Sequence, residues 1–185
     1  MIYVGTAGWS YKDWEGVFYP SDLKKDLQLS YLSERFNTVE INSSFYRIPE
    51  ERMVLSWIRK VEKNPQFLFT LKAYSPWTHE EKFSSEEGQK MKNILKILKE
   101  ENRLGLMLFQ FPYRVKFSVS FLNRLSFFKE FFEEFPLGVE IRNKTFQRAE
   151  FFNFLKEMEI SFANIDQPLI SQNIGPTKEF TANPG

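Results

Sequence analysis

The stretch Leu137-Gly-Val-Glu140-Ile-Arg142 is a short apolar run with charged residues at its carboxyl end. Parallel α/β barrels present their sites in this way, at the carboxyl ends of apolar strands that lead into helices. The same pattern occurs in four other stretches: Val39-Glu40-Ile41-Asn42, Phe67-Leu-Phe-Thr-Leu-Lys72, Leu106-Met-Leu-Phe-Gln110 and Phe162-Ala-Asn-Ile-Asp166. We therefore expect one site that collects Glu40, Asn42, Lys72, Gln110, Glu140, Arg142 and Asp166.

Strand and helix patterns alternate along the whole chain. We predict strands at 2–7, 38–42, 67–72, 105–111, 137–142 and 161–165. We predict helices at 24–36, 50–62, 86–100, 118–134 and 146–158. The strands are continuous apolar runs, which is typical of a parallel sheet covered on both faces. The pattern predicts an α/β fold, a parallel (β/α) TIM-type barrel with six βα units present. A six-unit open sheet is the structural alternative.

The length of the chain limits how much of a barrel it can form. A closed eight-unit barrel usually needs about 250 residues, whereas this chain has 185. We interpret residues 1–170 as a single, incomplete barrel-type domain and 171–185 as an irregular tail. The last two units are expected to be missing, so that the chain is a fragment or covers its open edges with a partner.

Composition excludes several kinds of site. The chain has no cysteine, which rules out disulfides, thiolate nucleophiles and Cys-based zinc or iron–sulfur centres. His79 is the only histidine, so a metal site built from several imidazoles is excluded. We expect no haem or flavin. A Mg²⁺ or Mn²⁺ site stays open, with the carboxylates of Glu40, Glu140 and Asp166 as candidate ligands.

Charge and hydropathy bear on partners and location. There are 25 Lys and Arg against 24 Asp and Glu, a net charge of +1, so nothing draws the chain generally to nucleic acid or to anionic membranes. No apolar run reaches the ~20 residues that span a bilayer. No basic segment followed by an apolar one opens the chain. We predict a cytoplasmic protein without a membrane partner.

Several motifs resemble a known family. They are Gly5-Thr6-Ala7-Gly8-Trp9-Ser10-Tyr11-Lys12-Asp13-Trp14, Val39-Glu40-Ile41-Asn42-Ser43-Ser44-Phe45-Tyr46, Phe69-Thr-Leu-Lys72 with Thr78-His79, Leu108-Phe-Gln110-Phe-Pro112, Val139-Glu140-Ile-Arg142 and Asp166-Gln167-Pro168. In this order they resemble the YecE-like proteins, catalogued as domain of unknown function 72. The resemblance implies a TIM-type barrel and no known reaction. It also implies a further carboxyl-terminal segment, which this chain lacks.

Each candidate charged residue has a structural alternative. Glu40 and Asn42 are expected on one face of their strand, where Glu40 either faces a ligand or pairs with Lys72 or Arg142. Glu140 acts as a base while Arg142 holds an anionic group, or the two form an ion pair. Lys72 is a Schiff-base lysine or, more simply, a charge partner. Asp166 either contacts a ligand or caps a turn.

The remaining candidates are a histidine, an amide and two aromatic residues. His79 lies in a predicted loop and is a candidate acid or base, because histidine titrates near neutrality. Gln110 is expected to hydrogen-bond to a ligand or to another site residue. Trp9 and Tyr46 belong to aromatic clusters that either stack on a ligand or plug the barrel rim.

These residues favour an enzyme that acts on a polar, anionic small molecule or nucleotide-like ligand. The expected chemistry is acid/base or carboxylate–metal assisted hydrolysis. Glu40, Glu140, His79 and Lys72 are the catalytic candidates, and Asn42, Gln110, Arg142, Asp166, Trp9 and Tyr46 the binding candidates. The alternatives are a nucleic-acid-binding or processing protein, which the balanced charge does not favour, and a non-catalytic binding protein.

Overall fold

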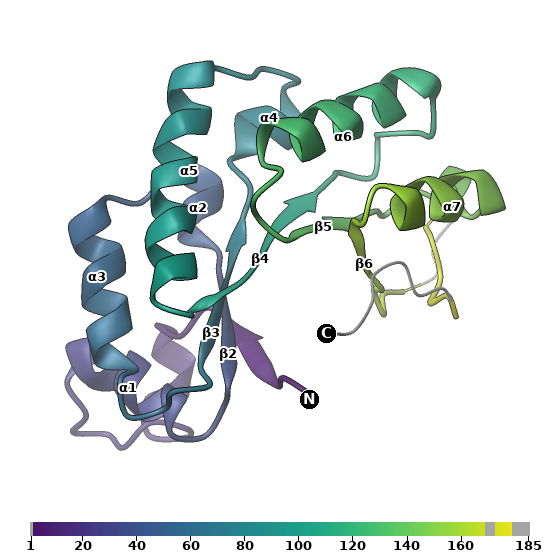
Figure 1. Cartoon of the computed structure of the whole chain (residues 1–185). Coiled ribbons are helices and arrows are strands. Elements are labelled where there is room, and N and C mark those ends of the chain that lie inside the picture. The colour runs from purple at the N-terminus through teal and green to yellow at the C-terminus, as the bar shows by residue number, and fades with distance from the viewer. Residues whose placement is uncertain (1, 169–172, 179–185) are drawn as a thin grey trace. The chain divides into compact units, whose positions relative to one another are not determined.

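A computed structural model describes residues 2–168 and 173–178. The chain forms two compact units that are interleaved along the sequence. The first takes its residues from Met1–Tyr74 and Phe83–Gly105, and the second from Ser75–Lys82 and Leu106–Gly185. Each unit has its own parallel strands and its own helices (Figure 1).

The first unit contains strands β1 (Gly5–Ala7), β2 (Thr38–Ile41) and β3 (Leu68–Lys72), which pair in parallel and in chain order. Its helical segments are η1 (Lys12–Trp14), η2 (Lys25–Leu27), α1 (Gln28–Ser33), α2 (Ser43–Tyr46), α3 (Glu51–Lys60) and α5 (Ser85–Glu100). Helices α3 and α5 pack side by side on one side of β2 and β3. Consecutive parallel strands must be joined by a long crossover, which here contains helices. A tight turn would instead place the next strand antiparallel to the first.

The two faces of β2 and β3 differ in burial. Val39, Ile41, Phe69 and Leu71 are fully buried. Their face packs on the helices, as the contact between the Trp57 and Phe69 rings shows, with centroids 6.2 Å apart. Glu40, Thr70 and Lys72 alternate with these residues and are only half-buried. The polar strand residues of this unit therefore share the face that the helices do not cover.

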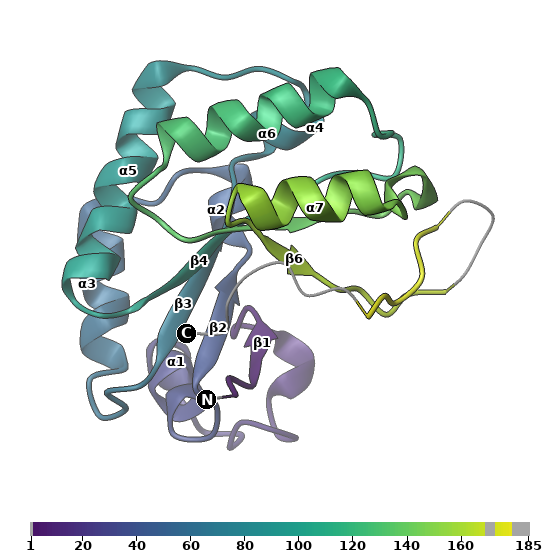
Figure 2. The ribbon, with the colours of Figure 1, turned by 45° about the vertical axis from the view of Figure 1, so that its right-hand side comes forward.

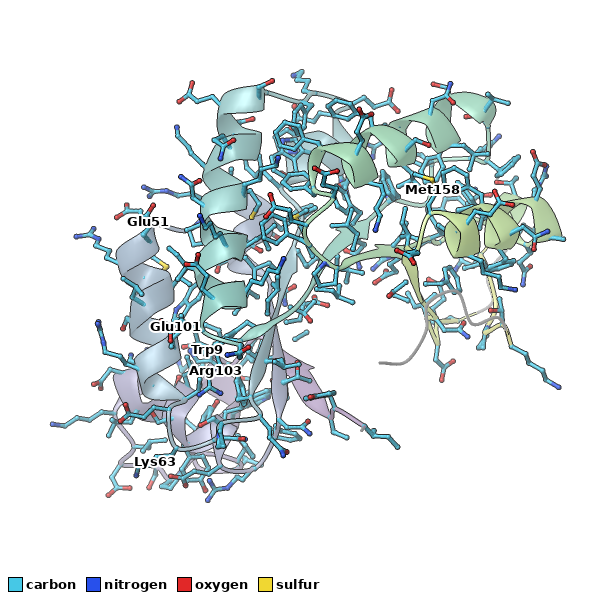
Figure 3. All side chains as sticks on the ribbon, viewed as in Figure 1. Trp9, Glu51, Lys63, Glu101, Arg103 and Met158 are labelled. Atoms are coloured by element: carbon cyan, nitrogen blue, oxygen red, sulfur yellow. The ribbon has the colours of Figure 1, made fainter. Side chains whose placement is uncertain are left out.

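Buried Arg103 joins two segments of the first unit. Its side chain, labelled in Figure 3, donates to the carbonyl oxygens of Asn64 at 2.6 Å and Phe67 at 3.3 Å. Its backbone carbonyl accepts from Phe69 N at 2.8 Å. A buried guanidinium is costly unless its donors are paired, and here they replace the water that would solvate those carbonyls.

Strand β4 (Leu104–Gln110) begins in the first unit and continues into the second. The second unit adds β5 (Leu137–Glu140) and β6 (Ser161–Ala163), again parallel and in chain order. Its helical segments are α4 (Ser75–His79), α6 (Val119–Phe131), η3 (Lys144–Phe146) and α7 (Ala149–Glu157). Figure 2 shows α6 and α7 running beside each other.

Phenylalanine rings form the core of this second unit. Phe109 of β4 stacks on Phe128 of α6 with centroids 4.6 Å apart, and Phe121 of α6 lies 4.8 Å from Phe146. Apolar residues that recur at helical spacing belong to this core, and each of them is at most 4 % exposed: Phe121, Phe128, Phe132, Phe135, Phe151 and Leu155. Burial of rings at helical spacing fixes which sides of α6 and α7 face the strands.

The predicted α/β class with six parallel strands is confirmed, whereas closure into a TIM-type barrel stays a prediction. The strands are shorter than predicted at most ends. Residues 139–142 alternate in burial as a strand would, but the β5 ladder ends at Glu140. The helix predicted at 24–36 is split into η2 and α1, and the span predicted as a helix at 146–158 contains the end of η3, extended Arg148 and α7.

Short helices were not predicted. Helix α4 occupies what we expected to be a loop, with Pro76 in its first turn, where a missing N–H is tolerated.

Of the predicted tail, only 173–178 lies within the described residues. There Asn173 bridges Asn143, and Ile174 N donates to the Arg142 carbonyl at 2.9 Å. Within the described residues no helix is both long and apolar enough to cross a membrane.

Candidate functional site

The second unit brings three of the candidate residues into contact at the carboxyl ends of β4 and β5. The register pairs Gln110 with Glu140, so both side chains project from the same face of the sheet. Gln110 Nε2 donates to Glu140 Oε1 at 2.6 Å, and Arg142 Nε donates to the same oxygen at 3.0 Å. Of the two kinds of partner that we considered for Gln110, a ligand or another candidate residue, the structure shows the second.

The carboxylate of Glu140 is held asymmetrically. Its side chain is 13 % exposed, and Oε1 accepts both of these hydrogen bonds. Oε2 makes no hydrogen bond to any residue that the structure describes, and it is not among the fully buried unpaired atoms. One oxygen is therefore fixed in place while the other is open to solvent or to a ligand.

Arg142 contributes only part of its guanidinium to this arrangement. Its side chain is 42 % exposed, and the ion pair to Glu140 uses Nε. The two terminal nitrogens make no hydrogen bond within the described part of the chain. The ion pair that we considered as the structural alternative is present, yet it leaves the two terminal nitrogens of the guanidinium available to donate hydrogen bonds. The residue lies two positions beyond the last ladder residue of β5.

The first unit places Glu40 and Lys72 on the less buried face of its strands. Glu40 lies at the end of β2, in register with Ala7 and Thr70. Lys72 Nζ lies 5.1 Å from the centre of the Phe45 ring, a cation–π distance. Asn42 lies outside β2, whereas we predicted a strand over 38–42. It has helical dihedral angles and precedes α2, because the chain turns immediately after Ile41.

A serine that sequence reasoning missed connects the ends of these two strands. Ser44 is fully buried, and its Oγ lies 2.7 Å from the Ile41 carbonyl oxygen and 2.8 Å from that of Lys72. A hydroxyl has one hydrogen to donate, so Ser44 serves one of these carbonyl oxygens at a time or shares its hydrogen between them. The Ser-Ser pair before an aromatic residue was the available signal, but only tertiary structure shows which serine faces inward.

His79 is the last residue of α4 and not a loop residue as predicted. Its Nδ1 lies 2.8 Å from Oγ1 of the buried neighbour Thr78. Its backbone carbonyl accepts from the guanidinium of Arg114. The histidine is half-buried, and these contacts tie it to its own helix and to the loop after β4.

The other three candidates differ in their surroundings. Asp166 is exposed and comes three residues after the end of β6. Trp9, labelled in Figure 3, packs edge-on against Trp57 of α3 at 5.8 Å, on the helix side of the first unit. Tyr46 is 76 % exposed and meets Phe45 edge-on at 5.1 Å. The Trp9 contact is that of a packing residue, while Tyr46 is open to solvent.

Among the described residues, no group of three or more His, Asp or Glu side chains is arranged to hold a metal ion. Glu140 accepts its hydrogen bonds from an amide and a guanidinium. Such donors suit an anionic or hydrogen-bonding ligand better than a divalent cation.

Comparison with known proteins adds a family and a set of related folds. The sequence model of the family described as "Protein of unknown function DUF72" matches residues 3–184. UPF0759 protein YunF of Bacillus subtilis (strain 168) is 28 % identical over 187 residues, covering 96 % of this chain and 64 % of YunF. The chain thus spans less than two thirds of that curated relative.

Solved structures of the same description are similar in fold. The crystal structure of a DUF72 family protein from Thermotoga maritima MSB8 is 32 % identical, with a TM-score of 0.85, and the match covers 98 % of this chain and 71 % of that one. A DUF72 family protein from Enterococcus faecalis V583 has a TM-score of 0.79 at 21 % identity, covering 98 % of this chain and 70 % of that one.

Proposed function

Because this chain belongs to the DUF72 family of proteins of unknown function, we propose a function from its own side chains: it binds the anionic group of a small polar molecule with Arg142 and exchanges a proton with that molecule through Glu140. The observation that carries this proposal is the shared hydrogen bonding of Glu140 Oε1 by Gln110 and Arg142, which leaves Oε2 open.

Arg142 supplies the binding half of this proposal. A guanidinium that uses Nε for one carboxylate still presents terminal N–H donors for a second anion, such as a carboxylate or phosphate. Half-exposure of the side chain lets a ligand reach it. Arginine forms paired, planar contacts to such groups that lysine cannot reproduce.

Glu140 supplies the chemical half. A general base must be within hydrogen-bond reach of the proton that it removes and must be held in a fixed orientation. Gln110 and Arg142 fix the carboxylate plane through Oε1, so Oε2 can accept the proton of a ligand bound to Arg142. The ligand is thereby a molecule with an exchangeable O–H, N–H or acidic C–H near its anionic group.

The test measures binding of a carboxylate probe to the purified chain by NMR. Malonate is titrated while the side-chain Nε–H signal of Arg142 and the side-chain amide signal of Gln110 are followed. Arg142→Gln is expected to weaken the affinity roughly tenfold to a hundredfold, because charge-assisted hydrogen bonds contribute about 1.5–3 kcal/mol. Lys144→Gln is the matched control, since Lys144 is exposed, lies two residues away and loses the same charge.

Glu140→Gln separates binding from proton transfer. It keeps the shape of the side chain and removes its charge, so malonate is expected to bind at least as tightly as it binds the unsubstituted chain.

Equal weakening by Arg142→Gln and Lys144→Gln, or no response of the Arg142 signal, would show that the probe binds elsewhere and would remove the basis of the proposal.

A TIM-type barrel is the fold that we propose for the whole protein. Its support is the run of parallel strands joined by helices, in chain order within each unit. In such barrels the carboxyl ends of the strands form one mouth. A crystal structure in which Glu40 and Glu140 open to different faces would contradict this part of the proposal.

A further inference from the structure

A separate basic cavity lies in the second unit, away from the contacts of Glu140. Its volume is about 270 Å³, and it is enclosed by residue 81, the loop after β4 and the first turns of α6. The side chains that matter for its chemistry are Glu81, Arg114, Lys116, Ser118, Ser120 and Arg124. Three cations thus face one carboxylate across a small volume.

Arg124 is the most deeply placed of these cations. Its side chain is 17 % exposed, and its guanidinium donates to the Trp77 carbonyl and pairs with Glu81 Oε1 at 3.1 Å. Burial lowers the pKa of the Arg124 guanidinium, and the charge of Glu81 opposes that effect. The Glu81 side chain is 74 % exposed, so water screens its negative charge. Glu81 therefore offsets the buried charge of Arg124 only in part.

Lys116 and Arg114 add charge that no carboxylate in the described residues neutralises. The Arg114 guanidinium donates to the His79 carbonyl, which leaves its full positive charge in place. Lys116 is exposed and makes no ion pair within the described part of the chain. The cavity therefore holds an excess of two positive charges over Glu81, in a chain whose overall net charge is +1.

Hydroxyl groups complete the lining. Ser118 Oγ accepts from Phe121 N at 3.1 Å, which caps α6, so its own hydrogen is left to donate. Ser120 is exposed in the first turn of α6. The cation set, and not the amino end of α6 by itself, defines the site. Guanidinium, ammonium and hydroxyl donors around one cavity match the several acceptor oxygens of a phosphate group.

We propose that this cavity binds the phosphate group of a small phosphorylated molecule. A volume of about 270 Å³ accommodates a phosphate with a short organic part. A nucleic-acid strand is the less suitable occupant, because strand binding uses a basic groove that tracks many phosphates. This site is independent of the anion site proposed at Arg142.

Calorimetric titration of the purified chain with glycerol 3-phosphate tests this assignment, with glycerol as the probe that lacks phosphate. Lys116→Gln is expected to weaken binding five- to tenfold, whereas Lys129→Gln, at the other end of α6, leaves it unchanged. Ser120→Asp is expected to abolish binding by adding a carboxylate at the cavity. An acidic residue in a first helical turn is compatible with folding, so loss of binding in this variant is not loss of the fold.

Three results would overturn the assignment. One is equal binding of glycerol and glycerol 3-phosphate. Another is an equal effect of Lys116→Gln and Lys129→Gln, and the third is tighter binding of a ten-nucleotide single strand than of glycerol 3-phosphate. The malonate response of Arg142 is expected to persist in Lys116→Gln and Ser120→Asp, so failure of either proposed site is distinguishable from failure of the other.

Discussion

Tyr19 illustrates how a single buried hydroxyl couples this protein to pH. The residue is 1 % exposed, and its hydroxyl donates to the Trp9 carbonyl at 2.6 Å. Burial raises its pKa from 10.0 to about 12, because the phenolate would lose its hydration. The folded state therefore holds this proton more tightly than the unfolded state does.

The sign of the pH effect follows from that shift. Below pH 10 both states carry the neutral phenol and the contribution of Tyr19 to stability is complete. Between pH 10 and 12 the unfolded state loses its proton first, so the free energy of unfolding falls. The loss amounts to about 2–3 kcal/mol for two pKa units. In Tyr19→Phe this part of the decline should be absent.

Urea denaturation at pH 9.5 and 11.5 measures the difference. Tyr46→Phe, which removes a phenol from a side chain that is 76 % exposed, controls for the loss of one hydroxyl. An identical decline in the unsubstituted chain and Tyr19→Phe would contradict the assignment of the effect to Tyr19.

Gly5 shows where a missing side chain is a structural requirement. A Cβ at this position would overlap the carbonyl oxygen of Thr38, the residue with which Gly5 pairs in β2. Backbone cannot move aside without breaking the β1–β2 ladder. Gly5→Ala is therefore expected to lower the free energy of unfolding by about 2–3 kcal/mol, at the upper end of overpacking costs.

The comparison for this substitution is Gly105→Ala. There the added Cβ would meet the Oγ1 atom of Thr70 at 2.9 Å, a side-chain atom that can rotate away. Chemical denaturation of both variants should rank Gly5→Ala as the more destabilised. The reverse ranking would mean that β1 is free to shift.

At the scale of elements, α4 depends on one arginine. Arg124 donates to the Trp77 carbonyl and pairs with Glu81, just beyond the end of α4. A five-residue helix has too few internal hydrogen bonds to be stable by itself. Arg124→Met, which keeps most of the apolar volume, should loosen residues 75–82 and cost about 1–3 kcal/mol.

Hydrogen–deuterium exchange over 75–82 measures that loosening. Exchange there is expected to rise in Arg124→Met while exchange over 149–157, the span of α7, changes little. Lys129→Met removes a positive charge from the same helix as Arg124 and should leave both segments unchanged. Unaltered exchange over 75–82 in Arg124→Met would show that ring packing of Trp77 on Phe132, 5.6 Å apart, holds α4 without the arginine.

Elements with several turns could be predicted from sequence, and short ones could not. Helix α5 begins where Ser84 and two glutamates predict a cap, and Ser84 Oγ accepts from Glu87 N at 3.5 Å. Helices α2 and α4 have four and five residues, which is too short for a repeating apolar pattern. The predicted strand ends differ from the observed ones, because the alternation of buried and less buried side chains continues beyond the last hydrogen bond between the strands.

The sequence predicts which residues meet in the site where these residues lie at the ends of neighbouring strands. Parallel strands bring their carboxyl ends to one edge, and Gln110, Glu140 and Arg142 do meet within the second unit. The hydrogen bond from Gln110 to Glu140 depends on register, which tertiary packing sets. Asp166 was misjudged in position, because β6 ends at Ala163 and leaves Asp166 exposed.

At the scale of the whole molecule, charge balance sets what the chain attracts. With 25 basic and 24 acidic side chains, no long-range field favours a polyanion. We expect no measurable binding to a 20-base-pair DNA duplex at 150 mM salt, and no more than weak, nonspecific binding at 50 mM. Fluorescence anisotropy at both salt concentrations measures this, and affinity that falls steeply with salt would instead indicate many phosphate contacts.

The interleaving of the two units along the chain has a consequence for biosynthesis. Residues 75–82 emerge from the ribosome before Arg114 and Arg124, the two arginines that hold them, have emerged. The nascent chain must therefore keep this segment unfolded, or shield it, while the neighbouring residues assemble around β2 and β3. Pulling on a stalled nascent chain in an arrest-peptide assay should register two separate folding events, with the one that docks α4 coming only after α6 has emerged.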